Sequence, residues 1–269
     1  MWRLVSFILA FPGIVWAATP EEIERLHAVL QTDVLMEILS EEGMEQSEDL
    51  RLEMFPGRGG VGWTATVAQI YRPDRLETLF RTAFDAELEE VDITPLMAFY
   101  DGDTGARVAA LEVEARRAIM SEEVEAAARA AYEDVRGSGT ERERLLEEFA
   151  DLNGLVDRNV AGALNANLAF FRGLASGPAF EMTEDQMLRD VWEQEPGIRE
   201  DTSGWVFGYM TFAYETLSDN QLSSYVDLTA TEAGRDLNRA LFAGFDAVFL
   251  DVSYALGAAT AQFAVGDEL

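Results

Sequence analysis

The sequence of 269 residues contains no cysteine, no lysine and a single histidine. Without cysteine there are no disulfides, thiolate metal sites, iron–sulfur clusters or cysteine nucleophile. All 20 basic residues are arginine, so Schiff-base chemistry and the phosphate-binding lysine of P-loops are also excluded. One histidine is too few for a multi-histidine metal site and leaves little for a Ser-His-Asp triad. We therefore expect neither a metal site nor a bound cofactor.

Acidic residues outnumber basic ones by 50 to 20, which gives a net charge of −30. A negative field of this size repels polyanions, so nucleic acid and anionic lipid are excluded as partners. Apolar residues make up 48% of the chain, which is a globular composition. The acidic surface favours solubility and does not indicate one particular ligand.

The first 17 residues have the features of a secretory signal peptide. Arg3 precedes an apolar run over residues 4–15, and Val15-Trp16-Ala17 places small or branched residues at the −3 and −1 positions. The run is shorter than the ~20 residues that a transmembrane helix needs. We predict cleavage after Ala17 and a periplasmic or secreted protein; retention of this segment as an N-terminal anchor is the alternative.

Helix starts are marked four times by a Ser or Thr followed three positions later by Glu or Gln. In this capping box the hydroxyl accepts from the N3 amide while the N3 side chain reaches back to the cap. The pairs are Thr19 with Glu22, Thr140 with Glu143, Thr183 with Gln186, and Ser218 with Gln221. Strand patterns are hard to find, so the sequence predicts an all-α, multi-helix bundle.

The clearest helical periodicity lies in the C-terminal segment. Apolar residues recur there every three or four positions from about residue 232 to 265, at Leu237, Leu241, Phe245, Val248, Val252, Leu256, Ala259 and Phe263. Phe242, Phe249 and Leu250 widen this surface, so we predict a long, mostly buried helix. A transmembrane helix would instead place Asp246 and Asp251 in hydrocarbon, at a cost of about 3 kcal/mol each. We therefore expect that the mature chain is not an integral membrane protein.

Glycine-rich breaks suggest two helical halves. A signal peptide at 1–17 is followed by an N-terminal half, 18–137, and a C-terminal half, 138–269, which we expect to form one compact unit. The halves share an apolar and glycine pattern at a constant offset of 129 residues, with Gly105 matching Gly234. A duplicated helix–turn–helix unit is a plausible origin of this weak similarity.

The same region resembles a known bacterial family. The stretch 70–119, with Phe99-Tyr100 closing one helix and Gly105-Ala106-Arg107-Val108 opening the next, resembles the domain-of-unknown-function family 2059. The chain departs from that pattern at Gly102-Asp103-Thr104-Gly105, which lacks the family's Ser-Pro, whereas Thr231 to Arg235 keeps the threonine and the glycine. The resemblance implies a secreted or periplasmic all-helical protein without an established activity, and it supplies no catalytic residues.

Two motifs have a simple structural interpretation. Residues 57–62 match the G-x-G-x-x-G dinucleotide fingerprint, but the charged and proline-containing segment before them does not resemble a buried strand, which favours a connector. Asp101, Asp103 and Glu112 match positions 1, 3 and 12 of a calcium-binding EF-hand loop. Position 6 of that loop needs glycine and is Ala106 here, so the start of a helix explains these residues more simply.

Polar residues set into apolar helical segments are the candidates for a site. They are Glu112, Asn165, Asn167, Arg172, Asn238 and Asp246. Because buried polar groups need partners, we expect Asn165 to bond Asn238 and Asp246 to face Arg172. Alternatively these side chains line a ligand pocket. His27, in the first helix, is interpreted as a boundary residue.

These observations favour an exported, non-enzymatic binding or scaffold protein of the cell envelope. Its partner would be an envelope protein or an apolar small molecule held between helices. The alternative is a carboxylate-dependent hydrolase of cell wall or glycan, although 50 acidic residues make close pairs inevitable and no catalytic residue stands out. Convergent acids in a cleft would favour the enzyme, and an apolar groove would favour binding. The oligomeric state is not indicated.

Overall fold

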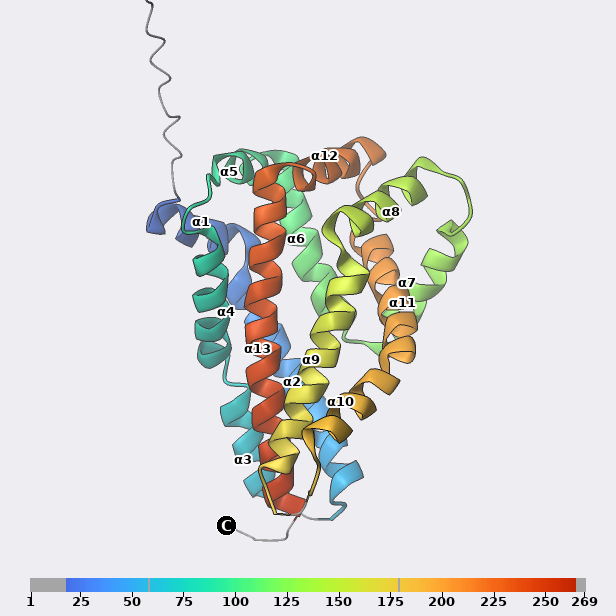
Figure 1. Ribbon diagram of the computed structural model, residues 1–269. Helices are drawn as coiled ribbons and strands as arrows, with labels where there is room; N and C mark the ends of the chain where they lie inside the picture. The colour runs from blue at the N-terminus through green and yellow to red at the C-terminus, as the bar shows by residue number, and fades with distance from the viewer. Residues whose placement is uncertain (1–17, 58, 179, 265–269) are drawn as a thin grey trace, which may run out of the picture.

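The computed structural model describes residues 18–57, 59–178 and 180–264, and within these ranges the chain is helical and has no strand (Figure 1). The helices are α1 (Pro20–Leu30), α2 (Thr32–Met54), α3 (Gly60–Ile70), α4 (Pro73–Leu88), α5 (Thr94–Tyr100), α6 (Asp103–Ala118), α7 (Glu122–Val135), α8 (Glu141–Asn153), α9 (Leu155–Ala175), α10 (Glu184–Glu193), α11 (Glu195–Ala213), α12 (Asp219–Thr229) and α13 (Glu232–Ala264). The predicted all-α, multi-helix bundle is confirmed. The predicted signal peptide at 1–17 lies outside the described residues.

Three of the four predicted capping boxes form completely, at Thr19, Thr183 and Ser218. The fourth forms in part: the Thr140 hydroxyl accepts from the backbone N–H of Glu143, but the Glu143 carboxylate accepts from the N–H groups of Gly137 and Gly139. The glutamate thereby ties the glycine-rich break to the first turn of α8.

The long helix α13 packs along α9 and α4 through the middle of the bundle (Figure 1). Its predicted stripe is buried at Val248, Val252 and Ala259, whereas Phe249 and Leu250 are 40% and 41% exposed, so the helix is buried on one side only. By length and composition α13 would suit a membrane span, the only such helix among the described residues.

Two glycines allow α9 and α13 to meet backbone to backbone. A Cβ added at Gly173 would lie 2.2 Å from the carbonyl oxygen of Tyr254, and one added at Gly257 would lie 2.1 Å from that of Phe170. No Cβ atom fits at such distances, so this close approach requires glycine in both helices.

The helix pairs α5–α6 and α12–α13 have the same local geometry at the predicted offset of 129 residues. A Cβ at Gly105 would lie 2.2 Å from the carbonyl oxygen of Phe99, and a Cβ at Gly234 would lie 2.1 Å from that of Leu228. At this offset α2 corresponds to α9, α4 to α11 and α6 to α13. Some helix contacts follow this correspondence: α4 packs on α13 and α11 packs on α6, while α2 packs on α4 and α9 packs on α11. Helices α6 and α13 therefore share a local geometry at their N-termini and some corresponding neighbours, while the extensive contact of α13 with α9 has only a small counterpart between α6 and α2.

The glycine-rich motif at 57–62 connects two helices. Helix α2 ends at Met54 and α3 begins at Gly60, with Gly59 as its N-cap residue. Because a helix precedes the motif, the strand that a dinucleotide site requires is missing.

His27 is buried, contrary to its interpretation as a boundary residue. Its Nδ1 lies 2.9 Å from Thr32 Oγ1 and its Nε2 lies 2.7 Å from Asp85 Oδ1, while the ring packs on Phe84. Both nitrogens are engaged within the protein, so His27 is a structural residue of the α1–α4 contact.

Candidate functional site

Two adjoining cavities open between the helices. The smaller, of about 270 Å³, is lined by residues of α5, α6, α8, α9, α11, α12 and α13. The larger, of about 760 Å³, lies mainly between α2, α6, α9, α11 and α13. Residues shared by the two linings include Glu112, Tyr209 and Phe242. The cavities therefore meet at Glu112.

Helices α6 and α13 turn equivalent faces toward these cavities. The lining positions of α6 are Ala109, Glu112, Val113 and Arg116, and those of α13 at the 129-residue offset are Asn238, Leu241, Phe242 and Phe245. Each set has the i, i+3, i+4, i+7 spacing of one helix face. The cavity thus lies between the two corresponding helices.

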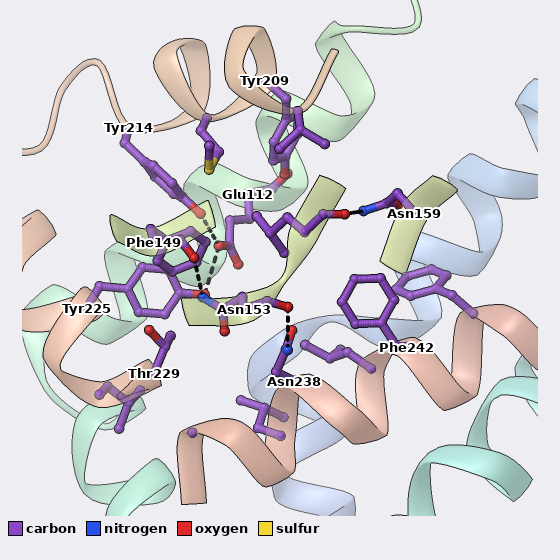
Figure 2. A pocket seen from close by; sticks show the side chains of 18 of the residues that line it. Glu112, Phe149, Asn153, Asn159, Tyr209, Tyr214, Tyr225, Thr229, Asn238 and Phe242 are labelled. Carbon is purple, nitrogen blue, oxygen red and sulfur yellow. Dashed lines mark hydrogen bonds between the residues drawn. The ribbon is translucent and has the colours of Figure 1, made fainter. Parts of the chain in front are cut away.

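Glu112 is the polar centre of the site (Figure 2). The hydroxyls of Tyr214 and Tyr225 donate to the same carboxylate oxygen, Oε1, at 2.6 and 3.0 Å. The hydroxyl of Tyr209 donates to the backbone carbonyl of Glu112 at 2.8 Å. No described residue donates to Oε2, and the accessible part of this side chain faces the cavities that it lines.

Burial controls the ionisation of this cluster. It raises the pKa of Glu112 above its ordinary value of 4.5, and the hydrogen bonds from Tyr214 and Tyr225 oppose that rise. The pKa values of Tyr209, Tyr214 and Tyr225 are raised as well, first by burial and then by the charge of Glu112. The hydroxyls therefore stay protonated, and Glu112 holds its proton more strongly than a solvent-exposed glutamate.

Several side-chain oxygen atoms that line the smaller cavity near Glu112 accept no hydrogen bond from the described residues. The Nδ2 of Asn153 donates to the Phe149 carbonyl at 2.8 Å, and the Nδ2 of Asn238 donates to the Asn153 carbonyl at 3.0 Å (Figure 2). The Oδ1 atoms of both asparagines, like Oε2 of Glu112, accept from no described residue. On the donor side, the indole N–H of Trp205 is without an acceptor among the described residues.

Aromatic rings form much of the remaining wall. The ring of Phe149 lies 5.0 Å from that of Tyr225 and 6.0 Å from that of Tyr214, and Trp205 stacks on Tyr209 at 5.2 Å. The smaller cavity is therefore largely apolar and aromatic, with its polar groups gathered around one carboxyl.

The charged residues of the larger cavity are mostly paired. Arg116 forms an ion pair with Glu42, and Asp201 binds Arg129 at 2.9 Å. Burial raises the pKa of Asp246, which the positive charge of Arg158 opposes. The Arg158 guanidinium lies 5.3 Å from the centre of the Phe242 ring.

The structure brings together four of the six sequence-predicted residues, since Glu112 and Asn238 line the smaller cavity and Glu112, Asn167 and Asp246 line the larger one. Asn165 and Arg172 line neither cavity; both are exposed.

The two predicted pairings are wrong. Asn238 bonds the backbone of Asn153 instead of Asn165, and Arg172 binds Glu184 instead of Asp246. On α9, Asn165 and Arg172 are seven residues apart and so share a face, which points away from the cavity. The four tyrosines around Glu112 were not predicted from the sequence: Tyr100 ends α5, Tyr209 and Tyr214 lie at the C-terminal end of α11, and Tyr225 lies in the middle of α12.

The calcium-loop alternative does not fit the geometry. Asp101 binds Arg25 at 2.6 Å, while Glu112 is bonded to tyrosines inside the bundle. Within the described ranges no group of three or more His, Asp or Glu side chains is arranged to hold a metal ion.

Comparisons of this chain with protein-family models, with curated proteins and with solved structures find no match.

Proposed function

We propose that this chain is an exported, non-enzymatic binding protein that holds a small, largely apolar molecule in the cavity between α6 and α13. One observation carries the proposal: the two adjoining cavities meet at a single carboxyl group. Their volumes, about 270 and about 760 Å³, lie near the range of roughly 300–1,000 Å³ typical of small-molecule sites. The aromatic lining provides the apolar surface that such a ligand would bury.

The arrangement of acids supports a binding protein over a glycan hydrolase. Hydrolysis by a carboxylate pair needs two acids facing one bond, one as proton donor and one as base or nucleophile. Glu112 is the one carboxyl group lining the smaller cavity. Of the other acids in the larger cavity, Glu42 and Asp201 are held in ion pairs and Asp246 is under the positive charge of Arg158.

Binding of a neutral fluorescent probe tests this proposal. N-phenyl-1-naphthylamine is apolar and uncharged at neutral pH, so the acidic surface does not repel it. We expect it to fluoresce on addition of the protein. Leu241→Trp, which fills the point where the cavities meet, should weaken binding at least tenfold.

Leu250→Trp is the matched control, because Leu250 lies on the same helix and is 41% exposed. Thermal melts establish that both variants fold. Equal binding by the wild type and the Leu241 variant would contradict a site in this cavity.

Export is part of the same proposal. Ala18, the residue after the predicted cleavage site, donates its N–H to the Val91 carbonyl at 3.0 Å, and Thr19 caps α1. Cleavage after Ala17 would leave both contacts intact. The intact mass of protein recovered from the periplasm of a Gram-negative host should correspond to a chain starting at Ala18; a full-length mass would contradict cleavage.

A further inference from the structure

Apart from the indole N–H of Trp205, the unpaired polar atoms around Glu112 are acceptors, which match a ligand that donates hydrogen bonds. The hydroxyls of Tyr209, Tyr214 and Tyr225 donate to Glu112 itself. The oxygen Oε2 of Glu112 and the amide oxygens of two asparagines are left facing the cavity without donors. These oxygens are accessible to water, so a ligand that displaces the water must supply donors at the same positions to avoid leaving them unpaired.

The surroundings also favour a positive charge. The nearest arginine on α6, Arg116, is neutralised by Glu42, and the smaller cavity contains no basic side chain. The faces of Tyr, Trp and Phe rings attract cations, and several such rings line this cavity. The net charge of −30 further raises the local concentration of cations at its entrance.

From this geometry we infer that the natural ligand is a primary or substituted amine with an apolar body, and that Glu112 binds its ammonium group. This inference rests on the proposed small-molecule function. The Oε2 atom of Glu112 accepts from the ammonium, the aromatic wall surrounds the adjoining carbons, and the apolar body extends into the larger cavity.

Ionisation of Glu112 couples binding to pH. Burial raises the pKa of this group and an ammonium ligand requires the ionised form, so amine binding should weaken as the pH falls through the raised pKa of Glu112. The groups that face Glu112 are Tyr100 from α5, Tyr209 and Tyr214 from the end of α11, and Tyr225 from α12, while Arg116 lies one turn further along α6. The tyrosine pKa values are all raised, so none of these groups is the source of that pH dependence.

Three probes of equal length distinguish charge from apolarity. Decylamine, decanol and decanoate share one chain and differ in the head group, and each competes with bound N-phenyl-1-naphthylamine. In salt of about 0.15 M, which screens the protein surface beyond ~8 Å, we expect decylamine to displace the probe at a concentration at least tenfold below that of decanol. Decanoate should be the weakest competitor.

The Glu112→Gln variant tests the carboxyl directly. The glutamine keeps an acceptor for Tyr214 and Tyr225 but places an N–H where Oε2 was, so the preference for amine over alcohol should disappear while decanol binding persists. Glu114→Gln is the matched control, since Glu114 is exposed on the same helix and its loss changes the net charge equally. General attraction of amines to the acidic surface affects both variants alike.

The outcomes separate the inference from the proposed function. Probe binding with equal competition by amine and alcohol, or an amine preference that survives in the Glu112 variant, would overturn the amine inference and leave the cavity function standing. If the wild type bound none of these molecules, the cavity function itself would fail. Calorimetry in two buffers of different ionisation enthalpy, repeated at decreasing pH, adds an independent readout: proton release on decylamine binding that grows as the pH falls in the wild type, and none in the Glu112 variant.

Discussion

The contact between α9 and α13 should fail when either of its glycines gains a methyl group. At Gly173 a Cβ would lie 2.2 Å from the carbonyl oxygen of Tyr254 and 2.7 Å from the backbone nitrogen of Ala258. Ordinary contacts begin at 3.4 Å, so the helices must separate by about 1 Å at this point. Gly257→Ala creates the same conflict with Phe170 from the other side.

The magnitude follows from two opposing effects. Overpacking a well-filled interior costs about 1–3 kcal/mol and more when backbone is displaced. Replacing glycine by alanine inside a helix returns at most about 1 kcal/mol. The conflict is with rigid backbone atoms, so we expect a net loss of about 2 kcal/mol for each single variant, which lowers the melting temperature by roughly 4–8 °C in a chain of this size.

Circular dichroism melts and urea titrations measure this loss. Gly197→Ala is the control, because Gly197 lies in the first turn of α11 with no atom within 4 Å of its added Cβ. We expect that variant to be as stable as the wild type or more stable by about 0.5–1 kcal/mol. The double variant at Gly173 and Gly257 should lose less than the sum of the two, because one separation relieves both conflicts. Single variants that melt together with the Gly197 control would refute the close approach of these helices.

Two further predictions concern the polar groups of the cavity. Asn238→Leu removes the donor to the Asn153 carbonyl at the end of α8 and should destabilise the fold by about 1–3 kcal/mol in urea titrations; unchanged stability would show that this carbonyl finds another partner. For Glu112 the folded-state pKa lies above its ordinary value of 4.5, so its contribution to stability is present below that pH and is lost as the pH rises through the folded-state pKa. The unfolding free energy of the wild type should therefore fall relative to Glu112→Gln as the pH rises above 4.5, by about 1.4 kcal/mol for each unit by which the folded-state pKa exceeds that value. Parallel pH profiles of the two proteins would contradict a raised pKa at Glu112.

Local signals predicted much of the fold from the sequence. A hydroxyl followed by Glu or Gln three residues later acts within one helical turn, so Thr19, Thr183 and Ser218 were recognisable without tertiary information. Thr140 shows the limit of such reasoning. The Glu143 carboxylate accepts instead from the N–H groups of the preceding glycine-rich turn. The spacing of residues in the sequence does not predict the conformation of that turn.

The candidate site was only partly predictable, because it is assembled from distant segments. Apolar neighbours in the sequence identified Glu112 and Asn238 as candidates, and both line the cavities. The same criterion also selected Asn165 and Arg172, which lie on an exposed face of α9. Periodicity defines the faces of a helix and not the neighbour that each face meets. The tyrosines around Glu112 lie up to 113 residues away from it, and no local pattern connects them.

The two corresponding helices differ at the position of Glu112. At the 129-residue offset the position of Glu112 on α6 matches Leu241 on α13, and both side chains line both cavities. The leucine shows that an apolar side chain suits this environment, so a carboxyl in the corresponding position carries a desolvation cost that packing alone does not require. Hydrogen bonds from Tyr214 and Tyr225 offset that cost for Oε1 and leave Oε2 to the cavity. Glu112 lines both cavities and its Oε2 has no donor among the described residues, so this side of the carboxyl is open to a ligand, whereas the corresponding leucine offers an apolar surface alone.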